Sequence, residues 1–79
     1  MSVSDQDDYL LGLQRMANQI AANFAGLGPA GAATSVADHL QRFWDPGMRR
    51  DLAQAVSANR VVVSDPVRAA IKALAVGAD

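Results

Sequence analysis

The chain has 79 residues and a formal net charge of −1, and 51% of its residues are hydrophobic, although 16 of these are alanine. It has no Cys, which excludes disulfides and thiolate metal sites, and its scattered Arg and Lys form no basic stripe for nucleic acid. No apolar run approaches the ~20 residues of a membrane span, and the start of the chain lacks a signal-peptide pattern. We therefore expect one soluble, cytoplasmic domain, residues 1–79, with no nucleic-acid or membrane partner.

The alanine-rich composition predicts a thin core. A domain near this size buries only about 60% of the surface that its unfolded chain exposes, so burial and chain entropy nearly cancel. Two alternatives follow. The chain is either a marginally stable monomer, or it gains stability from a partner or from self-association.

The first predicted helix spans about residues 5–26. Carboxylates in its first turn suit the positive end of a helix dipole, and Ser4 precedes them as the predicted N-cap. Gly26 is predicted to end the helix in the left-handed conformation. Its apolar positions recur in steps of three and four residues, as in an amphipathic helix: Tyr9, Leu13, Met16, Ile20, Phe24 and Leu27, flanked by Leu10, Ala17 and Ala21.

Leu11 falls on the polar side of this first helix. A singly exposed leucine is the simpler interpretation. Contact with another chain is the alternative, which makes Leu11 a candidate partner-binding residue.

The second predicted helix, about 30–44, should end at a corner. Proline disfavours the α conformation of the residue before it, so a helix cannot easily continue through Asp45. The same Asp45 can cap the next helix, about 46–59, with Pro46 at its first position. We expect the corner to hold two aromatic rings on its inner edge. The apolar stripe that leads into it is Ala33, Val36, Ala37, Leu40, Phe43 and Trp44.

After the third helix, residues 60–64 are rich in valine but have no partner strand, so we expect an extended connector whose valines cover the core. Asp65 and Pro66 repeat the cap-plus-proline start and predict a last helix over about 66–76. The sequence therefore predicts an all-α fold, a small bundle of four short helices. The ends, 1–4 and 77–79, are expected to be disordered.

The sequence offers no constellation for catalysis. His39 is the only candidate base, and it falls at the rim of the second stripe beside Phe43 rather than in a polar pocket. Asp45 and Asp65 are already explained as structural caps, and no glycine-rich phosphate loop follows a strand. We expect no catalytic, cofactor-binding or metal-binding residue in this chain.

The corner is the predicted site for a protein partner, because Trp and Arg are enriched at interface hot spots. For Trp44, burial in the core is favoured over partner contact. Arg49 is predicted to pair with a carboxylate, in this chain or in a partner, and Arg50 points outward. The full set of candidate partner-binding residues is Leu11, His39, Arg42, Phe43, Trp44, Arg49 and Arg50.

Three segments resemble the small delta subunit of soluble NAD-dependent formate dehydrogenases: Met16-Ala-Asn-Gln-Ile-Ala21, His39-Leu-Gln-Arg-Phe-Trp-Asp-Pro-Gly-Met-Arg49 and Asp65-Pro-Val-Arg-Ala-Ala-Ile-Lys-Ala-Leu74. The resemblance covers roughly residues 10–75, and its middle motif, aromatic-Trp-Asp-Pro-x-Met-Arg, is the specific part. Gly47 departs from the family pattern, where a basic residue is expected.

The resemblance implies a non-catalytic subunit of a cytoplasmic complex that oxidises formate to carbon dioxide and reduces NAD. In that family the alpha subunit carries a bis-MGD molybdenum or tungsten centre and iron–sulfur clusters, while the beta and gamma subunits carry FMN and further clusters. This chain would bind the complex, with the alpha subunit as the favoured partner, and stabilise or help assemble it. The alternatives are a transient assembly factor for insertion of the molybdenum cofactor and, less favoured, a free-standing helical adaptor.

Overall fold

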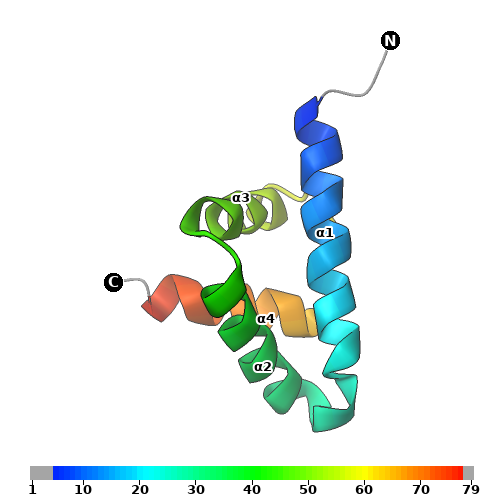
Figure 1. The fold of residues 1–79 in the computed structure, drawn as a ribbon, viewed down its shortest axis with the longest axis vertical. Coiled ribbons are helices and arrows are strands. Elements are labelled where there is room, and N and C mark those ends of the chain that lie inside the picture. The colour runs from blue at the N-terminus through cyan, green and yellow to red at the C-terminus, as the bar shows by residue number, and fades with distance from the viewer. Residues whose placement is uncertain (1–4, 78–79) are drawn as a thin grey trace.

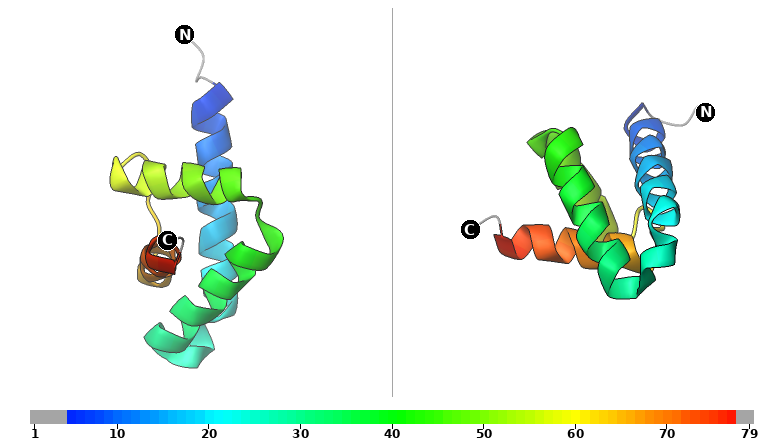
Figure 2. Two further views of the ribbon diagram at one scale, coloured as in Figure 1. Left: turned by 90° about the vertical axis from the view of Figure 1, so that its left-hand side faces the viewer. Right: turned by 60° about the horizontal axis from the view of Figure 1, so that its bottom comes forward.

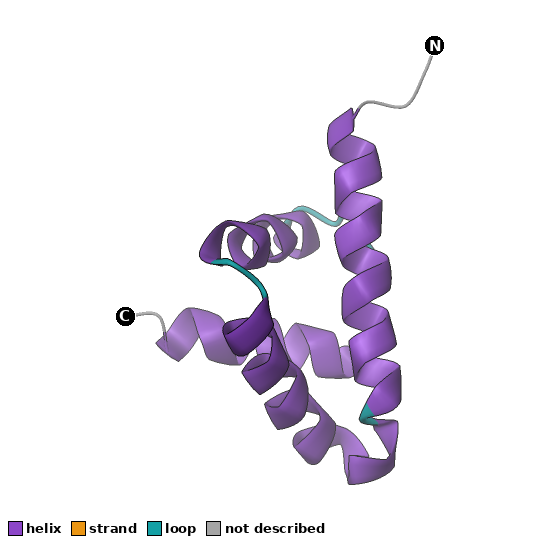
Figure 3. Cartoon of the chain, viewed as in Figure 1, coloured by secondary structure: helices purple, strands orange, loops and turns teal. Residues whose placement is uncertain are grey.

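The computed structural model describes residues 5–77, which contain four α-helices, one short 3₁₀ helix and no strand. This confirms the all-α class (Figure 3). In chain order the elements are α1 (Asp5–Asn23), η1 (Ala25–Leu27), α2 (Gly28–Phe43), α3 (Pro46–Ser57) and α4 (Asp65–Gly77).

The longest helix, α1, runs along one side of the molecule, and the other three gather beside it (Figure 1). After the short η1 turn, α2 returns at an angle to α1, and α3 then crosses α1 (Figure 2). α4 packs mainly against α2. Each of the four α-helices contacts the other three.

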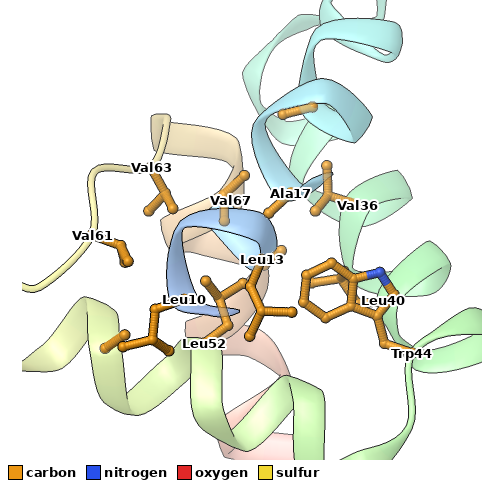
Figure 4. Packing of buried hydrophobic residues seen from close by; sticks show 13 residues of the cluster. Leu10, Leu13, Ala17, Val36, Leu40, Trp44, Leu52, Val61, Val63 and Val67 are labelled. Carbon is orange, nitrogen blue, oxygen red and sulfur yellow. The ribbon is translucent and has the colours of Figure 1, made fainter. Parts of the chain in front are cut away.

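The core is small and rich in alanine and valine. Trp44 is its largest member and is only 5% exposed, and its indole points toward Leu13 with Leu40 beside it (Figure 4). No polar or charged side chain is buried among the described residues. The buried residues are Leu10, Leu13, Ala17, Ala21, Ala32, Val36, Leu40, Trp44, Leu52, Ala55, Val61, Val63, Val67 and Ala70.

The buried face of α1 is rotated from the predicted stripe. The helix buries Leu10, Leu13, Ala17 and Ala21, whereas Tyr9 and Met16, which were predicted to be central, are 41% and 44% exposed. Small side chains let neighbouring helices approach this face closely. The larger residues are therefore left at the margins of the contact, and the predicted flank is the true centre.

The turn between α1 and α2 differs from the prediction. α1 ends at Asn23 rather than at residue 26, and the left-handed residue is Gly28, with φ 81° and ψ 167°. Glycine tolerates this positive φ, and the extended ψ is the one favoured before Pro29. α2 therefore begins at Gly28, two residues before the predicted start, with Pro29 in its first turn.

The connector between α3 and α4 is extended, as predicted. α3 ends at Ser57, two residues before the predicted boundary, and Asn59 then adopts a left-handed φ of 59°. Val61 and Val63 are buried while Val62 is 75% exposed, which is the alternation of an extended chain lying on a core.

Two amide side chains of α1 take the place of the missing partner strand. Gln14 Oε1 accepts a hydrogen bond from the Val62 amide at 2.8 Å. Asn18 Oδ1 accepts from the Ser64 amide at 2.9 Å, and its Nδ2 donates to the Val62 carbonyl at 3.0 Å. We call Gln14 and Asn18 the amide clamp. The clamp satisfies the backbone of the connector, which has no ladder of its own.

The two Asp-Pro helix starts differ by one residue. In α4 the first bond of the helical ladder runs from the Arg68 amide to the Ser64 carbonyl at 3.0 Å, so Ser64 occupies the N-cap position. Asp65 lies inside the first turn, rather than at the predicted N-cap position, and Pro66 follows it. Since Asn18 holds the Ser64 amide in the connector, the helix starts directly after Ser64.

At the ends of the chain, Gly77 is the last residue of α4 and not part of a disordered tail, in keeping with the frequency of glycine at helix ends. The predicted Ser4 cap and the predicted disorder of residues 1–4 and 78–79 lie outside the described residues.

Candidate partner-binding surfaces

The corner between α2 and α3 is built from local interactions. α2 ends at Phe43, one residue before the predicted boundary, and both Trp44 (φ −95°, ψ 140°) and Asp45 (φ −72°, ψ 162°) are extended. Asp45 Oδ1 accepts a hydrogen bond from the Met48 amide at 2.8 Å, and Pro46 is the first residue of α3. Asp45 therefore caps α3 through its side chain, with proline where its missing N–H is harmless.

Of the two aromatic residues of the corner, one is buried in the core and the other is exposed to solvent. Trp44 is buried, but Phe43 is 70% exposed, so the prediction that both rings lie on the inner edge is wrong for Phe43. Leu40 and Trp44 are buried, whereas Phe43, the last residue of α2, is exposed.

Phe43 packs instead against His39, with ring centroids 4.7 Å apart and an interplanar angle of 46°. His39 is half-buried, at the rim of the apolar face as predicted. We call His39 and Phe43 the aromatic ridge. The four-residue spacing places both rings on one exposed strip of α2.

The arginines of the corner have different surroundings. Arg42 pairs with Asp38 at 3.1 Å, one turn earlier on α2, and both side chains are well exposed, so the pair adds little stability. Arg49 Nη1 donates to the Gln41 carbonyl at 3.2 Å, which ties α3 to α2. Neither Arg49 nor the exposed Arg50 pairs with a carboxylate within residues 5–77.

Arg49 and Arg50 border a hollow of about 580 Å³ whose lining comes from α2, α3 and α4 and includes no residue of α1. We call this hollow the arginine groove. Its lining is mostly apolar and includes Ala37, Leu40, Ala53, Ile71, Ala73 and Leu74. No sequence pattern predicted this hollow, because alanines on an amphipathic helix do not show which neighbouring helices will meet there.

The predicted partner-binding residues therefore separate into distinct places. His39, Arg42 and Phe43 lie along α2, whereas Arg49 and Arg50 line the arginine groove. Ala37, Leu40 and Gln41 of α2 line the groove, whereas His39 and Phe43 do not. Leu11 is 40% exposed on α1 and lines neither this hollow nor the one described next, and Trp44 is in the core.

A second hollow, of about 560 Å³, lies where the start of α1 meets α3. Two of its lining residues, Tyr9 and Asp51, form a hydrogen bond in which the Tyr9 hydroxyl donates to Asp51 Oδ2 at 2.7 Å, and a third, Arg60, pairs with Asp7 at 3.0 Å. The hydrogen bond to Asp51, with partial desolvation and the nearby negative charge, raises the pKa of Tyr9 above its ordinary value. These contacts join elements distant in sequence, so we interpret this hollow as a structural contact between helices.

Within the described residues, no three His, Cys, Asp or Glu side chains come together as a metal site would require. None of the helices in that part of the chain combines the length and hydrophobicity needed to cross a membrane.

Comparison with curated proteins and with solved structures finds no significant match. A family model described as NADH-dependent formate dehydrogenase delta subunit FdsD matches residues 13–71. The match runs from the third turn of α1 into α4, and includes the amide clamp, the corner and the connector. The chain therefore belongs to the family of delta subunits of NADH-dependent formate dehydrogenase.

Proposed function

We propose that this chain is a non-catalytic delta subunit that binds the catalytic alpha subunit of a cytoplasmic NAD-dependent formate dehydrogenase, within a complex that also holds beta and gamma subunits. It stabilises or helps assemble the enzyme that converts formate and NAD to carbon dioxide and NADH. The observation that carries this proposal is the aromatic ridge, in which Phe43 is 70% exposed on a rigid corner.

Exposure of Phe43 is costly in a chain with so few large apolar side chains. Five of the buried residues, Ala17, Ala21, Ala32, Ala55 and Ala70, are alanines, which add little apolar area to the core. A large ring kept outside such a core is better explained by a partner surface that covers it, because interface hot spots are large side chains in desolvated pockets.

The corner also presents this ring in a fixed position. Trp44 anchors one side in the core, and the Asp45 cap fixes the start of α3 on the other. A binding group that is already ordered loses less conformational freedom on association, so more of its contact energy appears as affinity.

The cofactors of the complex are a bis-MGD molybdenum or tungsten centre, iron–sulfur clusters, FMN and NAD, and the residues of this chain do not fit them. Iron–sulfur clusters need cysteine thiolates, and the chain has no Cys. No buried polar side chain is available among the described residues to hold the polar groups of a dinucleotide.

The test is co-purification from cells that express all subunits. A tagged delta chain is expected to retain the alpha subunit through affinity purification and gel filtration in a fixed ratio. A tagged chain that elutes alone would refute the proposal.

Molybdenum content separates the stabilising subunit from the transient assembly factor. In enzyme purified from cells without the delta chain, full metal loading with a labile complex indicates a stabilising subunit. An intact but metal-poor complex indicates an assembly factor instead.

A further inference from the structure

We infer that the arginine groove holds an amphipathic helix of the alpha subunit, with its apolar side on the alanine-rich floor and carboxylates directed at Arg49 and Arg50. This inference rests on the proposed function, since it names the partner segment. It concerns a surface whose lining includes neither residue of the aromatic ridge.

The lining favours a protein segment over a small molecule. A small-molecule site of this volume normally has a few polar groups placed inside it to fix the orientation of the ligand. Here the floor consists of apolar side chains of α2, α3 and α4. The polar residues of the lining are Gln41, Arg49 and Arg50, and none of these three side chains is buried. Exposed Ala73 and half-buried Ala53 leave room for the backbone of another helix to approach closely.

The charge of the groove specifies the chemistry of its occupant. Its lining contains two arginines and no carboxylate. The bond from Arg49 Nη1 to the Gln41 carbonyl orients this guanidinium and uses only one of its five N–H groups. The remaining donors, with those of Arg50, are suited to charge-assisted hydrogen bonds to Asp or Glu.

A second copy of this chain is a poorer occupant. The face of α1 that carries its exposed Leu11 holds Arg15 as well as Asp8, and that arginine would meet Arg49 and Arg50. Along the aromatic ridge the nearby carboxylate, Asp38, is already paired with Arg42. A partner whose helix combines apolar and unpaired acidic residues fits the groove better.

The experiment compares two groove variants with matched controls, using the tagged chain co-expressed with the other subunits. Arg50→Glu reverses the charge at the rim, and Ala73→Glu places a bulky carboxylate on the floor. Arg68→Glu and Ala69→Glu make the same changes at exposed positions of α4 that do not line the groove. Circular dichroism melts of the isolated chains check that all four variants fold.

Both groove variants are expected to weaken binding of the alpha subunit at least ~10-fold, and both controls to retain it as the wild type does. Arg50→Ala is expected to weaken binding less and to reduce its dependence on NaCl concentration. If the wild type and both groove variants retain the alpha subunit equally, the inference about the groove is overturned, while the proposed function stands. If the wild-type chain retains no alpha subunit, both the proposed function and the inferred occupant of the groove are refuted. A wild-type dimer that Arg50→Glu dissociates would identify a second copy as the occupant and overturn the inference.

Discussion

The corner between α2 and α3 and the connector between α3 and α4 are held in place by different kinds of contact. At the corner between α2 and α3, the residues that set the geometry lie within three positions of one another, from Asp45 to Met48. In the connector between α3 and α4, the backbone of Val62 and Ser64 is held by Gln14 and Asn18, more than forty residues away in the sequence. Local chemistry therefore determines one turn, and tertiary structure determines the other.

The two regions also serve different ends. The corner presents an exposed aromatic ridge while anchoring itself through Trp44. The connector closes the core with Val61 and Val63 and leaves only Val62 outside. We propose that the corner binds a partner and that the connector stabilises the fold, and the following changes test that division.

Trp44→Ala should have the largest effect on the isolated domain. Removing a buried indole from a thin core is expected to lower the free energy of unfolding by about 3–5 kcal/mol. Urea denaturation followed by circular dichroism measures this. A loss below about 1 kcal/mol would mean that the indole does not support the core.

Asn18→Ala removes two hydrogen bonds from the connector and leaves the Val62 carbonyl and the Ser64 amide without these partners. We expect a loss of about 1–3 kcal/mol and faster hydrogen exchange at the Ser64 amide. Gln19→Ala, at the exposed neighbouring position, is the control and should change stability by less than about 0.5 kcal/mol. Equal effects of the two substitutions would exclude the amide clamp as a stabilising contact.

Asp45→Ala should cost about 0.5–2 kcal/mol, because the Met48 amide loses its acceptor at the start of α3. Asp45→Asn keeps a good capping side chain and should be nearly neutral. Fluorescence of Trp44, the only tryptophan, reports the unfolding of the region next to the cap. Identical melts for Ala and Asn would show that the cap does not stabilise the corner.

The hydrogen bond between Tyr9 and Asp51 should make the stability of the fold depend on pH only at alkaline pH. Because the folded protein raises the pKa of Tyr9, its contribution to stability is complete below the ordinary tyrosine pKa of about 10 and is lost as pH rises through the raised value. Tyr9 is the only tyrosine, so tyrosinate absorbance follows it directly. Asp51→Asn should move the midpoint down toward 10, and an unchanged midpoint would contradict the hydrogen bond as its cause.

The difference between corner and connector also explains what the sequence could predict. At Asp45-Pro46 the helix break, the cap and the start of α3 all depend on neighbouring residues, so they can be predicted from the sequence. The extended connector follows from its β-branched residues. The all-α class needs only the spacing of the apolar residues.

Other features depend on contacts between distant residues. Asn18 lies on the polar side of an amphipathic pattern, and only the position of the connector reveals its role. The rotation of α1 toward Ala17 and Ala21 depends on how closely its neighbours approach, which hydrophobicity alone does not encode. Contacts between distant residues also decide that Phe43 is exposed next to the buried Trp44. They likewise decide that three helices meet at the arginine groove.

The most direct measurement of the central claim is made on Phe43→Ala. In the isolated chain this substitution should change the free energy of unfolding by less than about 0.5 kcal/mol, because the ring lies outside the core. In cells that express the whole complex, the same tagged variant should lose the alpha subunit during gel filtration under conditions in which the wild type retains it. Full retention of the alpha subunit, or a large loss of stability in the isolated chain, would contradict the account.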